Sequence, residues 1–184
     1  MKHSPIRIGI TLVGAVVFAA TLAGCASTQP AVQPGFTDGQ IAGIISTINQ
    51  GAIRQAELAS SRATTPGVKE FAQTMLSDHH DVADKISSTL SQIHVTALDS
   101  DAARTLSDNA DQTVQALQTY QGAAFDRKFV QTEAAVHGYV HRLLQDTLIP
   151  ATRNAKLRNL LQAIDQGIQK HLSIAQGLEG SIGS

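Results

Sequence analysis

The spacing of apolar residues constrains the fold of this chain most strongly. From Thr37 onward these residues recur every three or four positions, and no segment alternates polar and apolar side chains as a β-strand does. The helical spacing extends over about 25 residues in each of four stretches, and over fewer residues in a fifth. The sequence therefore predicts an all-α fold whose four long helices cover 38–63, 66–93, 122–150 and 157–179.

The lengths of the connections predict how these helices are arranged. Only a few residues separate the first helix from the second and the third from the fourth, so each pair is expected to be antiparallel. The connection over 94–121 is long enough to run back along the bundle and contains the shorter helical stretch, around 106–117. Two hairpins joined by one long crossover define a ferritin-like four-helix bundle, which we expect to span 37–179 and to precede a short C-terminal tail at 180–184.

The N-terminus has the features of a bacterial export signal. Lys2 and Arg7 give a positive start, an uncharged apolar run covers 8–20, and Leu-Ala-Gly then precedes Cys25. This ending resembles the bacterial lipobox, which implies that 1–24 are removed and that Cys25 carries lipid. The alternative is a plain membrane anchor with an incidental cysteine, but the apolar run is shorter than the roughly 20 residues that a bilayer requires.

The segment at 25–36 contains Pro30 and Pro34 and has no periodicity, so we expect a tether between the lipid and the domain. By resemblance to the sorting of such lipoproteins, Ala26 after the cysteine implies the outer membrane, facing the periplasm. With a formal net charge of −1, 4% aromatic residues and no Trp, the chain lacks the basic surface and stacking platform of a nucleic-acid-binding protein. The expected contact with a membrane is through the lipid, and protein partners stay unassigned.

Four ionisable residues fall on the apolar faces of the predicted helices. His79, Glu133, His137 and His171 share the phase of their apolar neighbours, and helical rise places them at a similar height in the bundle. Buried ionisable groups are costly unless they are paired or bound to metal. Two interpretations stay open: a site for a transition-metal ion, or a hydrogen-bonded layer that fixes the register of the helices. Asp78 and His80 are expected in solvent and His141 at the edge of the apolar face, and Asp126 is expected to cap the helix after Gly122.

Three segments carry a family resemblance: VKEFAQTMLSDHH at 68–80, FDRKFVQTEAAVHGYV at 125–140 and QKHLSIAQGL at 169–178. They resemble the bacterial family called domain of unknown function 4142, whose members are ferritin-like and often exported. The resemblance implies a bundle over essentially the whole mature chain. It also implies a carboxylate in the first helix, where this chain has Ala52 instead.

The sequence does not identify a reaction. The di-iron pattern of ferritins requires Glu-x-x-His on two helices, but Leu76 and Ile168 stand three residues before His79 and His171. No nucleophile elbow or phosphate loop occurs, and the lone cysteine excludes a thiolate metal site. The sequence thus favours a lipid-anchored bundle with a structural or interaction role and no catalytic motif. The alternative is a metal-binding or redox protein that uses the four inward residues.

Overall fold

The computed structural model describes residues 35–182. The signal peptide expected at 1–24, the lipidation of Cys25 and almost all of the tether expected at 25–36 lie outside these residues. Residues 35–182 belong to one compact unit with its own hydrophobic core. Its elements in chain order are α1 (Asp38–Arg62), α2 (Pro66–Gln92), α3 (Asp101–Gln118), α4 (Gly122–Leu143), the π-helical segment η1 (Leu144–Leu148), α5 (Ile149–Ala151) and α6 (Ala155–Ile182).

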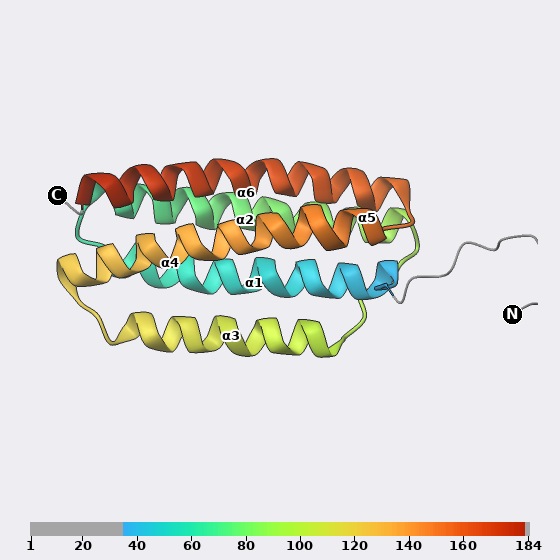
Figure 1. Ribbon diagram of the computed structural model, residues 1–184, viewed down its shortest axis with the longest axis horizontal. Helices are drawn as coiled ribbons and strands as arrows, with labels where there is room; N and C mark the ends of the chain where they lie inside the picture. The colour runs from blue at the N-terminus through green and yellow to red at the C-terminus, as the bar shows by residue number, and fades with distance from the viewer. Residues whose placement is uncertain (1–34, 183–184) are drawn as a thin grey trace, which may run out of the picture. The chain divides into compact units, whose positions relative to one another are not determined.

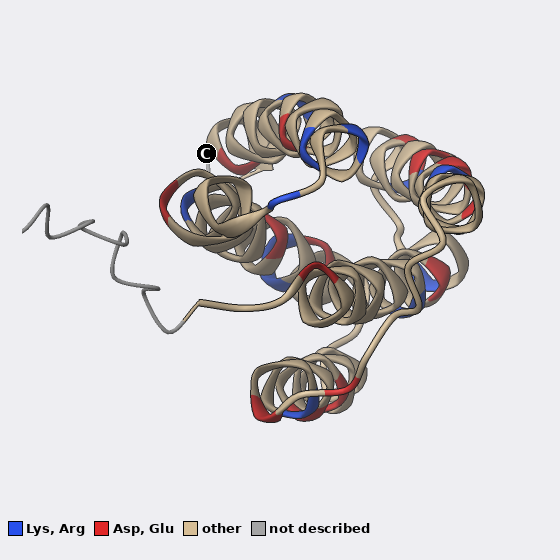
Figure 2. Cartoon of the chain, turned by 90° about the vertical axis from the view of Figure 1, so that its right-hand side faces the viewer, with Lys and Arg blue, Asp and Glu red and all other residues tan. Residues whose placement is uncertain are grey.

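The four long helices α1, α2, α4 and α6 form a bundle, and α3 lies outside it (Figures 1 and 2). Helix α1 packs along α2, α2 along α6 and α6 along α4, whereas α1 and α4 touch at few positions. The crossover helix α3 packs against α1. This arrangement confirms the ferritin-like fold, including the predicted shorter helix in the crossover. Every one of the five long helices carries side chains of both charge signs, and Figure 2 shows them interspersed.

Two helix starts show how local sequence sets the boundaries. The Thr37 hydroxyl accepts a hydrogen bond from the backbone N–H of Gln40, and the Gln40 side chain accepts one from Thr37 N–H, which completes a capping box. Helix α2 begins at Pro66 after Thr65, and no side chain caps its first turn. Asp126 of α4 accepts hydrogen bonds from the backbone N–H groups of Thr64 and Thr65. The prediction that Asp126 caps its own helix is therefore wrong.

The crossover is held close to α1 by small residues. Helix α2 ends at Gln92, and the turn after it contains His94, which has a positive φ of 54°. In this turn Val95 N–H donates to Leu90 O at 3.1 Å. The following loop crosses α1 at Gly43, where a Cβ atom would lie 2.0 Å from the carbonyl oxygen of Leu98. Because that neighbour is backbone, only glycine allows this approach, and the sequence thereby positions α3.

Two predicted helix ends are too early. The helix after Gly122 was expected to stop at Pro150, but the chain continues through η1 and α5 to Ala151. The proline falls in the first turn of α5, where its missing N–H is not required. The final helix continues through Gly180 to Ile182, so most of the tail expected at 180–184 is helical instead.

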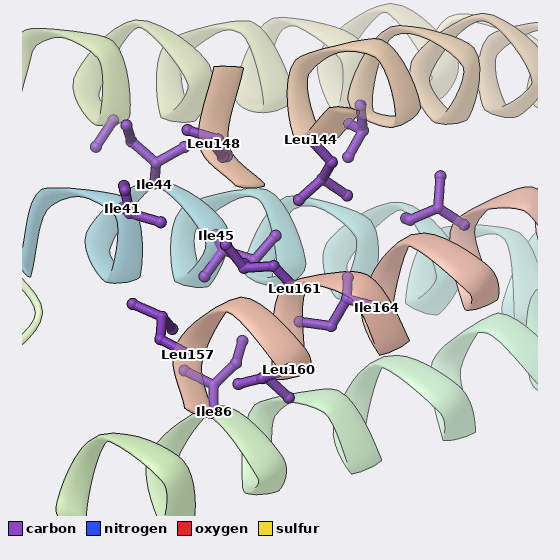
Figure 3. Close-up of a cluster of buried hydrophobic side chains, with 13 residues drawn as sticks. Ile41, Ile44, Ile45, Ile86, Leu144, Leu148, Leu157, Leu160, Leu161 and Ile164 are labelled. Atoms are coloured by element: carbon purple, nitrogen blue, oxygen red, sulfur yellow. The ribbon is translucent and has the colours of Figure 1, made fainter. Parts of the chain in front are cut away.

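Two apolar clusters fill the bundle on either side of a polar layer. One consists mainly of Ile and Leu side chains from α1, α2, η1 and α6, which Figure 3 shows converging. The other contains Phe71, Phe125 and Phe129 and lies toward the α1–α2 connection. Burial of such side chains is the main force that holds the helices together. Within residues 35–182, no helix combines the length and the apolar character that a membrane span requires.

Candidate metal centre

Three histidines from three different helices meet between the two apolar clusters. His79 lies on α2, His137 on α4 and His171 on α6, and each side chain is at most 5% exposed. One side-chain nitrogen of each lies within 4.8 Å of the other two. The three histidines are buried because each lies on the apolar face of its helix. They meet because they lie at similar levels along the bundle axis.

The protonated nitrogen of His79 follows from its hydrogen bonds. The Asn49 side-chain amide donates to the backbone oxygen of His79 at 2.8 Å, so the amide nitrogen faces that carbonyl. The amide oxygen then faces Nδ1 of His79, also at 2.8 Å, and accepts its proton. This neutral tautomer has a lone pair on Nε2, which is the form that ligates a metal.

The other two rings are oriented in the same manner. Nε2 of His171 lies 2.9 Å from a carboxylate oxygen of Asp78, to which it donates. Nδ1 of His137 donates to the backbone oxygen of Glu133 at 2.9 Å. Each ring therefore uses one nitrogen as a donor and keeps a lone pair on the other. Partners of this kind orient metal-binding histidines in known metal sites.

The remaining nitrogens have no hydrogen-bond partner. Nε2 of His79, Nε2 of His137 and Nδ1 of His171 are all buried and unpaired. Buried polar atoms in proteins are nearly always paired, and nitrogens that carry only a lone pair cannot donate hydrogen bonds to one another. The site therefore needs a group that accepts electron pairs or donates protons.

The separations of the rings suit a metal ion of ordinary size. The ring centroids lie 6.0 Å apart for His79 and His137, 5.4 Å for His79 and His171, and 5.3 Å for His137 and His171. With metal–nitrogen distances of about 2.0–2.1 Å, tetrahedral coordination would place such centroids about 5.2 Å apart. The three centroid separations are thus within about 1 Å of that value.

Glu133, the fourth residue of the predicted layer, does not reach the common point. It is 0% exposed, and its carboxylate lies 3.3 Å from Nδ1 of His137, on the side of the ring that donates. Neither carboxylate oxygen makes a hydrogen bond of good geometry. The sequence placed Glu133 in this layer, and its carboxylate contacts the ring of His137 without joining the three histidine nitrogens.

Burial favours the neutral form of two of the three rings, His79 and His171. Burial, followed by the neighbouring rings of His137 and His171, lowers the pKa of His79 from 6.5 to about 3. Burial also lowers the pKa of His171, although its hydrogen bond to Asp78 acts in the opposite direction. Protons therefore do not compete effectively for these nitrogens at neutral pH.

Sequence reasoning missed two participants, Asn49 and Asp165, and misplaced a third, Asp78. Asn49 lies on the inward face of α1, where a polar residue among isoleucines and alanines was a usable signal. Asp78 was expected in solvent but contacts His171, and His141 was expected at the edge of the core but bonds to the buried Asp165, which was not predicted. Helix α1 carries Ala52 near this level and contributes no ligand.

Two hollows reach the histidines from opposite sides. One lies between α2 and α6, has a volume of about 220 Å³ and is lined by His79 and His171. The other lies among α1, α3 and α4, has a volume of about 330 Å³ and is lined by His79 and His137.

Fold and site together define a ferritin-like helical bundle with a trihistidine layer. The chain belongs to the family described as domain of unknown function DUF4142, whose model matches residues 22–178. The structure is similar to that of a putative secreted protein DUF305 from Streptomyces coelicolor, with a TM-score of 0.67 and 14% sequence identity over 80% of this chain and 94% of that one. No curated protein matches the chain.

Proposed function

We propose that this chain is a lipid-anchored envelope protein whose helical domain binds one late transition-metal ion through His79, His137 and His171. The observation that carries the metal proposal is the set of three buried, unpaired imidazole nitrogens in rings whose other nitrogens are fixed by hydrogen bonds. We infer that these unpaired nitrogens are the ones that meet.

The donor set indicates which ion binds. Three neutral imidazoles without a thiolate suit Cu²⁺ and Zn²⁺, whereas Mg²⁺ and Ca²⁺ prefer oxygen ligands. The nearby carboxylates of Glu133 and Asp78 compensate two positive charges without entering the coordination shell. Three protein ligands leave a fourth position for water or another small ligand, which is the arrangement of open zinc sites.

Metal binding is tested on the domain at residues 34–184 after treatment with a chelator. Calorimetric titration with Zn²⁺ should give one ion per chain, and His79→Ala should weaken binding by at least about 100-fold. His80→Ala is the matched control, because His80 is the exposed neighbour on the same helix. A thousandfold excess of Zn²⁺ over its dissociation constant should add about 4 kcal/mol to the free energy of unfolding.

Two results would overturn the metal proposal. One is the absence of saturable Zn²⁺ and Cu²⁺ binding at micromolar concentrations. The other is an equal loss of affinity in the His79 and His80 variants. A water molecule that donates to two of the rings would then account for the layer, and its role would be to fix helix register.

The anchor is supported by the sequence alone. Cys25 is the only cysteine and follows Leu-Ala-Gly after an uncharged apolar run. Acylation at the cysteine with more than one chain gives stable attachment to a membrane. Cys25→Ser should abolish labelling of the chain by radioactive palmitate, and undiminished labelling would contradict the anchor.

A further inference from the structure

We propose that a metal ion reaches the three histidines through the hollow between α2 and α6, and that Asp78 is the carboxylate that first binds it. This inference rests on the proposed metal site and adds how that site is filled. A route is needed because the three unpaired imidazole nitrogens are buried, so an ion cannot reach them from solvent unless one of the rings moves. The two hollows that border the histidines differ in charge.

The charges favour entry between α2 and α6. The hollow among α1, α3 and α4 has no Lys, Arg, Asp or Glu in its lining, so a hydrated cation would lose water there without meeting a carboxylate. The hollow between α2 and α6 is lined by Asp78 and Asp81 and also by Lys85 and Lys170. After burial, which lowers the pKa of His171, the largest influence on that pKa is Asp78, and Lys170 acts more weakly. An entering cation therefore meets a carboxylate beside the buried ring.

His171 is the ring whose hydrogen bond is the easiest to replace. The side chain of Asp78, which accepts from Nε2 of His171, is 42% exposed, so water can take its place. The partners of the other two rings belong to Asn49 and Glu133, which are at most 3% exposed. A carboxylate that binds a cation is a weaker acceptor, so an ion on Asp78 loosens the bond that holds the ring. Asp78 thus couples the arrival of the ion to the movement of His171.

Gly167 leaves space beside this ring. It stands one turn before His171 on α6 and lines the hollow, and a Cβ atom there would meet nothing within 4 Å. Side chains of a helix lean toward the preceding turn, so His171 leans toward Gly167. Glycine inside a helix is unfavourable relative to alanine, and no neighbouring atom requires it here. We infer that the missing side chain keeps the path open.

Two phenylalanine variants of the domain at residues 34–184, which forms one compact unit, test the route. Stopped-flow mixing with Zn²⁺ and a zinc-sensitive dye measures association, and mixing of the loaded domain with a chelator measures dissociation. Gly167→Phe should lower both rates at least about tenfold and change the dissociation constant less than about twofold, because an obstructed path slows entry and exit equally. Gly177→Phe is the matched control and should change neither rate, because Gly177 is an exposed, uncrowded glycine of α6 outside the hollow.

Opposite charge changes test the part played by the lining. Asp81→Asn should slow association about twofold at low ionic strength, and Lys170→Gln should speed it by about the same factor. Asp78→Asn removes the first ligand, so it should slow association more than Asp81→Asn does. Ala135→Phe narrows the other hollow and should change no rate.

Three results would overturn the proposal. They are equal effects of the two phenylalanines in α6, slower uptake in Ala135→Phe with normal uptake in Gly167→Phe, and normal uptake in Asp78→Asn. Absence of Zn²⁺ binding to the unsubstituted domain would instead overturn the metal site itself, and this inference with it. The two failures are therefore distinguishable.

Discussion

Two buried polar clusters lie in the same bundle, and they differ in how completely their hydrogen bonds are made. Asp165 is 2% exposed, and both of its carboxylate oxygens are used: His141 lies 2.7 Å from one, and Gln145 and Gln169 donate to the other at 2.8 and 2.7 Å. In the trihistidine layer, each ring has one partnered and one unpartnered nitrogen. Both clusters include a histidine of α4 and a residue of α6, one helical turn apart on α4.

The difference teaches that burial of a titratable group does not by itself indicate a functional site. The Asp165 cluster is complete, so it serves to join α6 to α4 and η1. The trihistidine layer is incomplete without an additional group, which is what a binding site requires of its apo form. Mutation of the Asp165 cluster should therefore reduce stability without changing metal affinity. Mutation of the trihistidine layer should reduce metal affinity.

The largest expected effect is on the complete cluster. Asp165→Ala leaves three side chains without their acceptor and should reduce the free energy of unfolding by about 3 kcal/mol, as measured by urea denaturation at pH 7. Asp146→Ala, at an exposed position of η1, is the control and should change stability by less than about 0.5 kcal/mol. The Zn²⁺ affinity of the folded Asp165 variant should stay unchanged. Loss of metal binding there would show that the two clusters are not independent.

Acid should affect the incomplete cluster next most strongly. Because the pKa of His79 is about 3 in the folded domain and 6.5 in the unfolded chain, the unfolded chain takes up the proton first as pH falls. The stability that the domain gains from keeping His79 neutral is fully present above pH 6.5 and is lost progressively as the pH falls toward 3. The metal-free domain should therefore lose about 2 kcal/mol by pH 5.

Urea denaturation between pH 7 and pH 5 measures this loss of stability. Carboxyl groups ordinarily titrate below this pH range, so they contribute little to it. His79→Gln retains a polar side chain but removes the titrating ring, so its stability should depend less on pH. An equally steep pH dependence in the variant would show that other groups cause the loss.

The smallest effect should have the opposite sign. Glu133→Leu removes a fully buried carboxylate that makes no good hydrogen bond, so the metal-free domain should gain about 1 kcal/mol in urea denaturation. The same variant should bind Zn²⁺ about tenfold more weakly, because a negative charge behind His137 is lost. The exposed Glu57→Leu should change neither quantity. A loss of stability in the Glu133 variant would contradict this prediction and would show that Glu133, like Asp165, stabilises the fold.

The sequence determined the helices and the residues that face inward. Apolar periodicity is a local property, so it placed four long helices and the crossover helix, and it put His79, His137 and His171 in one layer. Helix ends were less accurate: Pro150 and Gly180 suggested stops that the packed chain passes, because both residues fit within helical segments here.

Only the tertiary structure decided which nitrogens are paired. The partners Asn49 and His79 are 30 residues apart, and His171 and Asp78 are 93 apart, so no local pattern relates them. Their pairing depends on small rotations and translations of one helix against another, as does the contact of Glu133 with the back of His137. The periodicity of one helix fixes the direction of a side chain, but a hydrogen bond requires an atom of another helix within about 3 Å.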